Sequence, residues 1–327
     1  MEMKGFTKCE NGHYYKEELA SCPYCRDGQR PTEASNPKGE TQLYTEQKDG
    51  NKTRIVLPKT PEQQSNRTVF GDEVKGEIDG REVVQSEYRS SSVGIEMIAV
   101  EGGTFLMGAQ KTDPNAPNYD ADAQDNKWNS ESPVHKVTLS DYFIGKYPVT
   151  QAQWKAVMGN NPSFFVGDNL PVEQVSWNDV QDFIRKLNQK TGKNYRLPTE
   201  AEWEFAARGG NQSRDYKYSG SNTDDNVAWC NANSDRKTHP VGTKQANELG
   251  IYDMSGNVWE WCSDWYGDYS SDSQTNPRGA STGSNRVLRG GSWYNIAWYY
   301  VRVSYRIYFR PDIRLNDLGF RLALSSN

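Results

Sequence analysis

The sequence predicts a loop-rich α+β fold for most of this chain of 327 residues. Strand-like segments come first, three helical segments follow, and strands return near the end, with little of the alternation that a parallel sheet needs. Hydrophobic residues make up only 35% of the chain and aromatic residues 12%, which favours loops held together by aromatic clusters. Each helical segment also begins with a capping signal.

The first strands are expected from about Ile95 onward, where β-branched and aromatic residues are concentrated. Glu101-Gly102-Gly103 supplies the first turn, and residues 110–132 form a polar loop rich in Asp and Asn. The predicted strands of this block are 96–100, 104–107, 136–139 and 142–144.

Three helices are expected next. Thr150 stands three residues before Gln153, which is the spacing of a capping box, and the same spacing recurs at 176–179 and 199–202. In the middle helix the apolar residues of 180–187 recur at i, i+3, i+4 and i+7, so one face is buried. Each predicted helix then reaches a glycine, at Gly159, Gly192 and Gly209.

The C-terminal stretch combines a fixed frame with crowded aromatic residues. Gly290-Gly291 permits a tight backbone path, Trp293 is a large apolar anchor, and residues 319–323 are predicted to be a closing strand. Strands are also expected at 286–288 and 300–305. Neither a period of 2 nor one of 3.6 places all the intervening aromatics in a core. Some of them should therefore face solvent, as on a binding surface; the alternative is a core strand and a loop with incidental tyrosines.

Charge and hydropathy exclude some classes of protein. The formal net charge is −5, which gives no general attraction to nucleic acid. The sequence has no run of about 18 apolar residues, so no membrane span is predicted. Residues 1–6 lack the apolar core of a signal peptide, which predicts a cytoplasmic location. A non-classical route to the surface, or a place in a phage particle, stays open.

Residues 5–28 predict a small zinc ribbon. Four residues of ligand type occur with the spacing of a structural zinc site, and a Cys-x2-Cys knuckle can present two thiolates on one turn. A segment this short needs such a staple in order to fold. A closed site of four ligands leaves no catalytic position, so the expected role is structural or docking. The predicted ligands are Cys9, His13, Cys22 and Cys25.

Residues 29–92 are predicted to be a flexible polar linker, because prolines interrupt a stretch dominated by Thr, Gln, Glu, Lys, Asn and Ser. Two short segments, 53–57 and 81–84, resemble strands and could pair with either neighbouring module. The main domain is expected at 95–325.

Several motifs of the main domain resemble the formylglycine-generating-enzyme family, which is also called the sulfatase-modifying-factor family. The resemblance covers about residues 95–325 and implies a C-type-lectin-like α+β fold. The motifs are Pro148-Val-Thr-Gln-Ala-Gln-Trp154, Pro171-Val-Glu-Gln-Val-Ser-Trp177, Tyr195-Arg-Leu-Pro-Thr-Glu-Ala-Glu-Trp-Glu-Phe205, Gly250-Ile-Tyr-Asp-Met-Ser-Gly-Asn-Val-Trp-Glu-Trp261, Arg289-Gly-Gly-Ser-Trp293 and Gly319-Phe-Arg-Leu322.

The resemblance does not imply the family's oxidase activity. Oxidase members bind copper through two cysteines beyond the Gly-Gly-Ser motif, and these positions are Asn295 and Tyr300 here. Neither residue supplies the thiolate that a soft metal requires. Cys230 and Cys262 lie outside the motif and are expected to be buried structural residues. His135 and His239 are far apart in the sequence, so we expect no activated nucleophile.

The span 289–323 also resembles the variable region of proteins diversified by retroelements. Random replacement of adenines in an AAC codon yields Tyr, Ile, Phe, Leu, Asp, Arg or Asn, and these types fill the suspect positions; Trp298 needs a different template codon. Arg302, Arg306, Pro311, Asp312 and Arg314 are expected to belong to the fixed scaffold. The predicted variable, ligand-binding residues are Tyr294, Asn295, Ile296, Trp298, Tyr299, Tyr300, Tyr305, Ile307, Tyr308, Phe309, Arg310, Ile313, Leu315, Asn316 and Asp317.

One possible calcium site follows from the resemblance to the enzyme family. In the enzyme family a structural Ca²⁺ lies at the Gly-Asn-x-Trp-Glu segment, which makes Asn257, Val258 and Glu260 candidate ligands here. Trp177-Asn178-Asp179 is similar to the calcium motif of sugar-binding lectins, but here it is better explained as the start of a helix. Sugar binding through calcium is therefore not expected.

Together these observations predict a non-catalytic binding protein whose C-terminal surface recognises a macromolecular partner, expected to be a protein. Two alternatives stay open: an oxidase of the formylglycine type that acts on protein cysteine, and a structural adaptor that acts through the zinc ribbon.

Overall fold

The computed structural model describes residues 93–125, 130–295 and 298–325 with their side chains, and the backbone of six strands before them. The chain divides into two compact units, Met1–Ser65 and Asn66–Asn327. In the first unit β1 (Phe6–Lys8) pairs with β2 (Tyr14–Lys16), and β3 (Glu46–Asp49) pairs with β4 (Lys52–Ile55). All four predicted zinc ligands lie outside the described residues. The zinc ribbon therefore stays a prediction.

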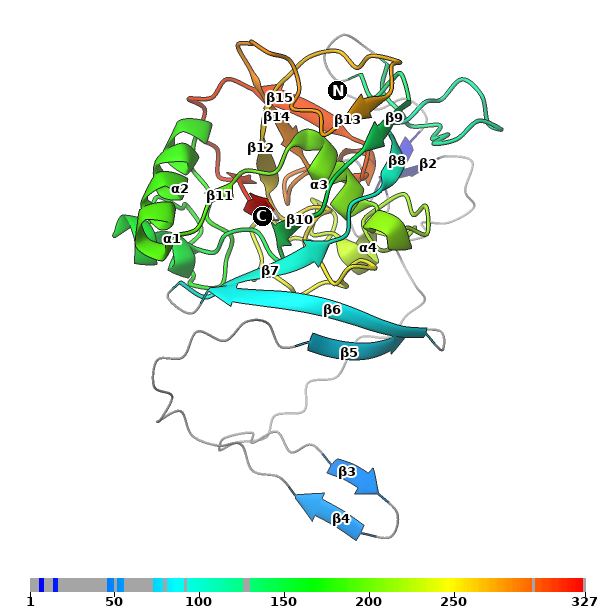
Figure 1. The fold of residues 1–327 in the computed structure, drawn as a ribbon. Helices are drawn as coiled ribbons and strands as arrows, with labels where there is room; N and C mark the ends of the chain where they lie inside the picture. The colour runs from blue at the N-terminus through cyan, green and yellow to red at the C-terminus, as the bar shows by residue number, and fades with distance from the viewer. Residues whose placement is uncertain are drawn as a thin grey trace. The chain divides into compact units, whose positions relative to one another are not determined.

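The second unit contains a six-stranded antiparallel sheet with the order β11-β17-β10-β7-β6-β5 (Figure 1). Its last strand in sequence, β17, pairs with both β10 and β11, so the end of the chain closes the sheet. The bounds are β5 (Glu73–Ile78), β6 (Arg81–Ser90), β7 (Ile95–Val100), β10 (Tyr142–Gly145), β11 (Tyr195–Arg196) and β17 (Ala323–Ser325).

Two of these strands come from the predicted linker. β6 contains the strand-like segment 81–84 and pairs with β7 along Glu87–Ser90, and β5 pairs with β6. Residues 73–78 and 81–90 of the segment 29–92 are therefore strands of this sheet; the sequence left strand pairing at 81–84 open and gave no strand at 73–78.

Two smaller mixed sheets carry the rest of the strands. A four-stranded sheet has the order β15-β14-β12-β16, and a three-stranded sheet has the order β13-β9-β8. The bounds are β8 (Thr104–Met107), β9 (His135–Thr138), β12 (Trp259–Trp265), β13 (Gln274–Thr275), β14 (Arg286–Arg289), β15 (Arg306–Phe309) and β16 (Leu318–Gly319).

The helices begin where the capping signals place them. Thr150, Ser176 and Thr199 each accept a hydrogen bond from the backbone N–H three residues on, and each makes a full capping box. The Asp179 of the Trp-Asn-Asp motif therefore serves as a cap partner. The helices are α1 (Gln151–Met158), α2 (Trp177–Thr191), α3 (Glu200–Ala207) and the short α4 (Asp224–Val227), with 3-10 turns η1 (Gly210–Gln212) and η2 (Trp298–Val301).

Aromatic residues fill much of the core. Trp154 stacks on Phe183 of α2 at 5.1 Å and meets the edge of Phe320 at 6.2 Å, so the α1–α2 pair is fixed to the C-terminal segment. Trp203 and Trp261 are also wholly buried. The prediction that loops are held by aromatic clusters is confirmed for this unit.

Two predicted strands differ in the structure. The closing strand expected at 319–323 is interrupted, because residues 320–322 lie between β16 and β17 and belong to neither. Residues 300–305 do not form a strand; η2 covers 298–301, turns follow, and the strand β15 begins at Arg306. The alternation of tyrosines and valines resembles a strand locally, but the buried Arg302 reaches across the unit and fixes a compact turn instead.

Candidate functional site

The C-terminal tail, residues 289–323, runs from β14 through η2 and β15 to the closing segment. Gly290 and Gly291 turn the chain with φ angles of 94° and 73°, which favour glycine. A Cβ on Gly291 would lie 2.7 Å from Cγ1 of Val301 and 2.9 Å from the carbonyl oxygen of Tyr300. The turn therefore requires glycine because η2 packs directly against it.

Trp293 joins the two ends of the tail. Its indole Nε1 donates to the carbonyl of Asn316 at 3.0 Å, and its side chain is 5% exposed. Beside it the Ser292 hydroxyl donates to Asp317 Oδ2 at 2.8 Å. The predicted anchor is thus confirmed, and these two bonds close the segment between residues 293 and 316 into a loop, of which residues 301–306 are buried.

Two buried arginines hold the middle of this loop. Arg302 is 0% exposed; it donates to Glu131 at 2.7 and 2.9 Å and to Asp120 at 3.0 Å. Arg306 donates to both carboxylate oxygens of Glu200 at 2.7 and 2.8 Å. A buried charge is tolerated only when it is paired and hydrogen-bonded. Both residues are scaffold, as the sequence predicts.

A third scaffold arginine holds the tail from outside. Arg314 forms a bidentate pair with Asp179 at the start of α2, with both distances 2.7 Å. The pair is half exposed, so it contributes modestly to stability and mainly fixes position.

The predicted variable residues that the structure describes are exposed, half-buried or, in two cases, buried. Tyr294 is 52% exposed, Trp298 45% and Leu315 37%, and Arg310 is also exposed. Ile296 lies outside the described residues. The half-buried members are Asn295, Tyr299, Tyr300, Ile307, Tyr308, Phe309, Ile313 and Asn316.

Two members of the predicted set are wrong as surface residues. Tyr305 is 2% exposed and packs in the core, with its ring 5.0 Å from Tyr300 and 6.1 Å from Trp259. Asp317 is 9% exposed and accepts from Ser292. The sequence cannot distinguish them because their residue types match those of their neighbours.

The structure adds apolar residues that sequence reasoning missed. Phe164 is 65% exposed and Val166 80% exposed, in the loop after α1. Between them Phe165 meets the edge of Trp293 at 5.3 Å, and Trp293 in turn meets Tyr294 at 5.4 Å. This loop therefore borders the exposed end of the tail. The available signal was two adjacent phenylalanines after the glycine that ends the first predicted helix.

Asn295 and Tyr300, the positions where the sequence resemblance places the cysteines of oxidase members, make other contacts in the structure. Asn295 Oδ1 accepts from the backbone N–H and the hydroxyl of Ser292, and the Tyr300 ring lies 4.3 Å from Tyr299. Cys230 and Cys262 are both buried, in different clusters of the core. Burial raises the pKa of each thiol, which disfavours the reactive thiolate.

The candidate calcium ligands do not fit a cation in this arrangement. Both carboxylate oxygens of Glu260 accept from the buried Arg321, at 2.6 and 2.7 Å, and Oε2 also accepts from Trp203. The Asn257 amide bonds to the backbone of His239 instead. A guanidinium already neutralises the carboxylate that calcium would need. Among the described residues, no group of three or more His, Cys, Asp or Glu is placed to hold a metal ion.

A buried carboxylate lies beneath the tail. Glu173 is 0% exposed; its Oε1 accepts from the Phe165 N–H at 2.8 Å, while its Oε2 is buried with no partner among the described residues. Burial, and to a smaller extent the nearby Asp317, raises the pKa of Glu173 to about 7, although backbone hydrogen bonds at Phe164 and Phe165 act in the opposite direction. The site thus contains a group that titrates near neutral pH.

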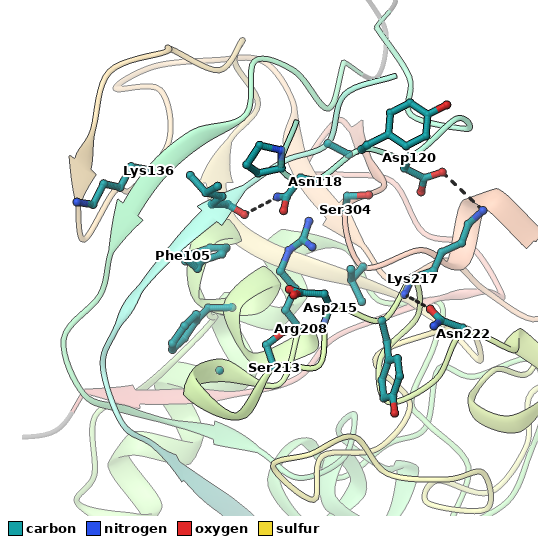
Figure 2. Close-up of a pocket in the computed structure, with 18 of the residues that line it drawn as sticks. Phe105, Asn118, Asp120, Lys136, Arg208, Ser213, Asp215, Lys217, Asn222 and Ser304 are labelled. Carbon is teal, nitrogen blue, oxygen red and sulfur yellow. Dashed lines mark hydrogen bonds and ion pairs between the residues drawn. The ribbon is translucent and has the colours of Figure 1, made fainter. Parts of the chain in front are cut away.

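A groove of about 980 Å³ lies on another part of this unit (Figure 2). It is lined by β8, the 117–122 loop, the end of α3, the 210–217 segment and residues 303–304. Lys217 connects it to the tail, because its Nζ lies 4.5 Å from the centre of the Trp298 ring.

The three packed sheets and the closed C-terminal loop define a C-type-lectin-like domain. Residues 83–326 match the family model described as the sulfatase-modifying factor enzyme 1-like domain, and this chain belongs to that family, as its motifs predict. The solved structure of Treponema denticola variable protein 1 is 35% identical, with a TM-score of 0.63 over 74% of this chain and 99% of that one. The predicted resemblance to variable proteins is confirmed by this similarity.

Two curated proteins are similar in sequence. Chaperone protein LppX of Paenibacillus barcinonensis is 35% identical, covering 62% of this chain and 80% of that protein. The formylglycine-generating enzyme of Streptomyces coelicolor is 38% identical, covering 54% of this chain and 59% of the enzyme. This chain therefore spans about three fifths of that enzyme. Among the described residues, no helix is long and apolar enough to cross a membrane.

Proposed function

We propose that this chain is a non-catalytic ligand-binding protein whose C-terminal tail is diversified by a retroelement. The supporting observation is a difference in burial within the tail. Arg302 and Arg306 are buried in ion pairs, whereas Tyr294, Trp298 and Leu315 face solvent in the same span. Exposed residues can change without cost to the core, while the paired arginines keep the frame constant.

The expected ligand is a protein. Tyr and Trp give large contact area at low entropic cost, and a few such residues dominate most protein interfaces. The exposed Phe164 and Val166 flank Phe165, whose ring meets Trp293 beside Tyr294, and they would add a constant apolar contact to every variant of the tail. The zinc ribbon, if it forms, would serve docking.

We also propose that this chain does not oxidise cysteine as the oxidase members of the family do. Asn295 and Tyr300 stand where oxidase members have cysteines, and the two cysteines of the described domain are buried in separate clusters. We therefore expect no aldehyde when the full chain is incubated with copper and a Cys-containing peptide. Turnover under these conditions would favour the oxidase alternative.

The direct test of diversification uses the DNA around the gene. We expect a near-copy of codons 289–323, rich in AAC, beside a reverse-transcriptase gene. If no such copy and no such gene are present, the proposed diversification by a retroelement is wrong.

Ligand binding is tested separately. A partner is selected from a displayed protein library against the full chain, and the double variant Tyr294→Ala/Trp298→Ala is compared with the exposed control Arg185→Ala. We expect at least a tenfold loss of affinity in the double variant only, which corresponds to about 1.4 kcal/mol or more. Equal losses would refute the tail as the binding surface.

A further inference from the structure

The strand β8 has one free edge. It is the last strand of the sheet β13-β9-β8, and among the described strands only β9 pairs with it. Gly103 and Leu139 exchange both backbone hydrogen bonds, at 3.0 and 2.8 Å. In an antiparallel pair such bonded pairs alternate, so Phe105 and Met107 point their backbone groups at β9. Thr104 and Leu106 point theirs to the opposite side.

This free edge forms one wall of the groove. Thr104, Phe105 and Leu106 all line it, and the Thr104 and Leu106 side chains are exposed. In the part of the chain that the structure describes, the N–H and C=O of Thr104 and the N–H of Leu106 have no hydrogen-bond partner. A free edge of this kind is a template for another strand.

Two asparagines limit the free edge. The Asn118 amide donates to the carbonyls of Leu106 and Gly108, both at 2.7 Å, and closes the far end. At the near end Asn211 donates to the Gly102 carbonyl at 3.1 Å. The open part is about three residues long, or about 10 Å at 3.3 Å per residue. It therefore suits a short extended segment and not a whole additional sheet.

The charges around the groove are mostly neutralised. Asp120 pairs with Arg302, Asp122 pairs with Lys217 at 2.6 Å, and the remaining arginine, Arg208, pairs with Glu204. Lys136 is the exception on the strand wall, since it is exposed and has no ion pair with any described residue. Figure 2 shows Lys136 on the strand beside β8, and it is the register partner of Leu106. Both side chains therefore lie on the same face.

We propose that this groove binds an extended peptide segment, which adds a strand to β8 and places an acidic side chain against Lys136. Unpaired main-chain groups give such a site affinity for any extended backbone, and the side chains beside the edge give it selectivity. The lone cation selects a carboxylate on the face shared by Leu106 and Lys136. Asp215 on the groove wall selects against a second acidic residue.

This site is distinct from the tail surface, although Lys217 touches both. Val303 and Ser304, the tail residues that line the groove, are buried, and neither belongs to the predicted variable set. A peptide held here would be recognised in the same way by every variant of the tail. The proposal does not depend on diversification.

The first test needs no identified ligand. A displayed random heptapeptide library is panned against the full chain, and one enriched peptide is synthesised as the probe. Amide hydrogen exchange is then followed with and without it. We expect the Thr104 and Leu106 amides to exchange fast in the free protein and to slow at least tenfold with the peptide. Phe105 and Met107, bonded to β9, should be slow in both states. Unchanged exchange at Thr104 and Leu106 would overturn the proposal, as would a library without enrichment.

The second test uses matched variants. Leu106→Pro removes the free N–H without touching the bonds to β9, whereas Leu106→Ala removes only the side chain. Peptide affinity should fall at least tenfold in the Pro variant and less than threefold in the Ala variant.

Peptides enriched on Lys136→Glu should carry Lys or Arg where those on the wild type carry Asp or Glu. Peptides that lose affinity in Trp298→Ala but not in Leu106→Pro would assign binding to the tail and refute the groove. If Leu106→Pro does not fold, the charge reversal and the amide exchange decide.

Discussion

At the scale of single residues, the tail is governed by charges removed from water. Arg302 and Arg306 lie among aromatic and acidic side chains, and Arg306 also stacks on Tyr266 and Tyr269, at 4.3 and 4.0 Å. Such residues cannot vary, because loss of one partner leaves an uncompensated buried charge. An arginine on the same tail but exposed to water carries no such constraint.

Arg306→Met tests this contrast. We expect a loss of about 3 kcal/mol in unfolding free energy, because the buried Glu200 loses its bidentate partner and keeps only the Tyr269 hydroxyl and the more distant Arg289. Arg310→Met removes an exposed arginine four positions away and should change stability by no more than about 0.5 kcal/mol. Urea denaturation of both variants measures the difference. Similar losses would mean that the two arginines are not separated into scaffold and surface.

Glu173 predicts a pH dependence of stability. Burial raises its pKa from 4.5 to about 7, so the folded protein holds a proton that the unfolded chain releases. The contribution of this protonated carboxyl group to the free energy of unfolding is fully present below about pH 4.5, and it is lost as the pH rises through about 7. Glu173→Gln keeps an uncharged side chain and should remove this slope. Relative to the wild type, the variant should gain stability between pH 5 and pH 8 in urea denaturation. A difference independent of pH would contradict this.

At the scale of elements, the turn at Gly290-Gly291 determines where η2 packs. Gly291→Ala adds a methyl group 2.7 Å from Val301 Cγ1 and at a positive φ. We expect a cost of at least about 2 kcal/mol, from the left-handed backbone and the overlap together.

Gly159→Ala is the matched control for this prediction. Gly159 has a φ of 81° at the C-cap of α1, but nothing lies within 4 Å of an added Cβ. It should therefore cost only the backbone term, about 1–2 kcal/mol. Thermal unfolding of the two variants measures the difference. Equal shifts in melting temperature would show that the close approach of η2 to Gly291 does not matter for stability.

The strand that was predicted at 300–305 and is not observed is also a question of local elements. Val301, Val303 and Tyr305 alternate as in a strand, but Arg302 and Ser304 between them are buried as well, so the pattern was wrong about both burial and conformation. The backbone path here depends on Arg302 reaching Glu131, 171 residues away in sequence, and no local periodicity records that contact.

At the scale of the whole second unit, stability and recognition are assigned to different residues of one span. The exposed Tyr294, Trp298 and Leu315 make few of the contacts that close the core, whereas Tyr305 lies inside it.

The triple variant Tyr294→Ala/Trp298→Ala/Leu315→Ala should therefore lose no more than about 1.5 kcal/mol, at about 0.5 kcal/mol for each exposed site. Tyr305→Ala alone should lose about 3–5 kcal/mol, as large buried aromatics do. Calorimetry on the four proteins, wild type and Arg310→Met included, gives the comparison. A larger loss in the triple variant would mean that the tail surface is part of the core.

The sequence alone determined the family, the helices and the frame. Capping boxes, the apolar stripe of 180–187 and the Gly-Gly-Ser-Trp turn depend on local rules, and local interactions decide them whatever the rest of the chain does. Arg302 and Arg306 were also assigned to the scaffold from the sequence, although Arg can arise from an AAC codon; their buried ion pairs supply the physical reason.

Only the tertiary structure decided which aromatics face solvent. Tyr294 and Tyr305 are the same residue type in the same span, yet one is 52% exposed and the other 2%. The loop of Phe164 and Val166 beside the tail and the free edge of β8 likewise depend on contacts between distant segments. Exposure is a property of how the chain packs against itself, so no local pattern of residues can fix it.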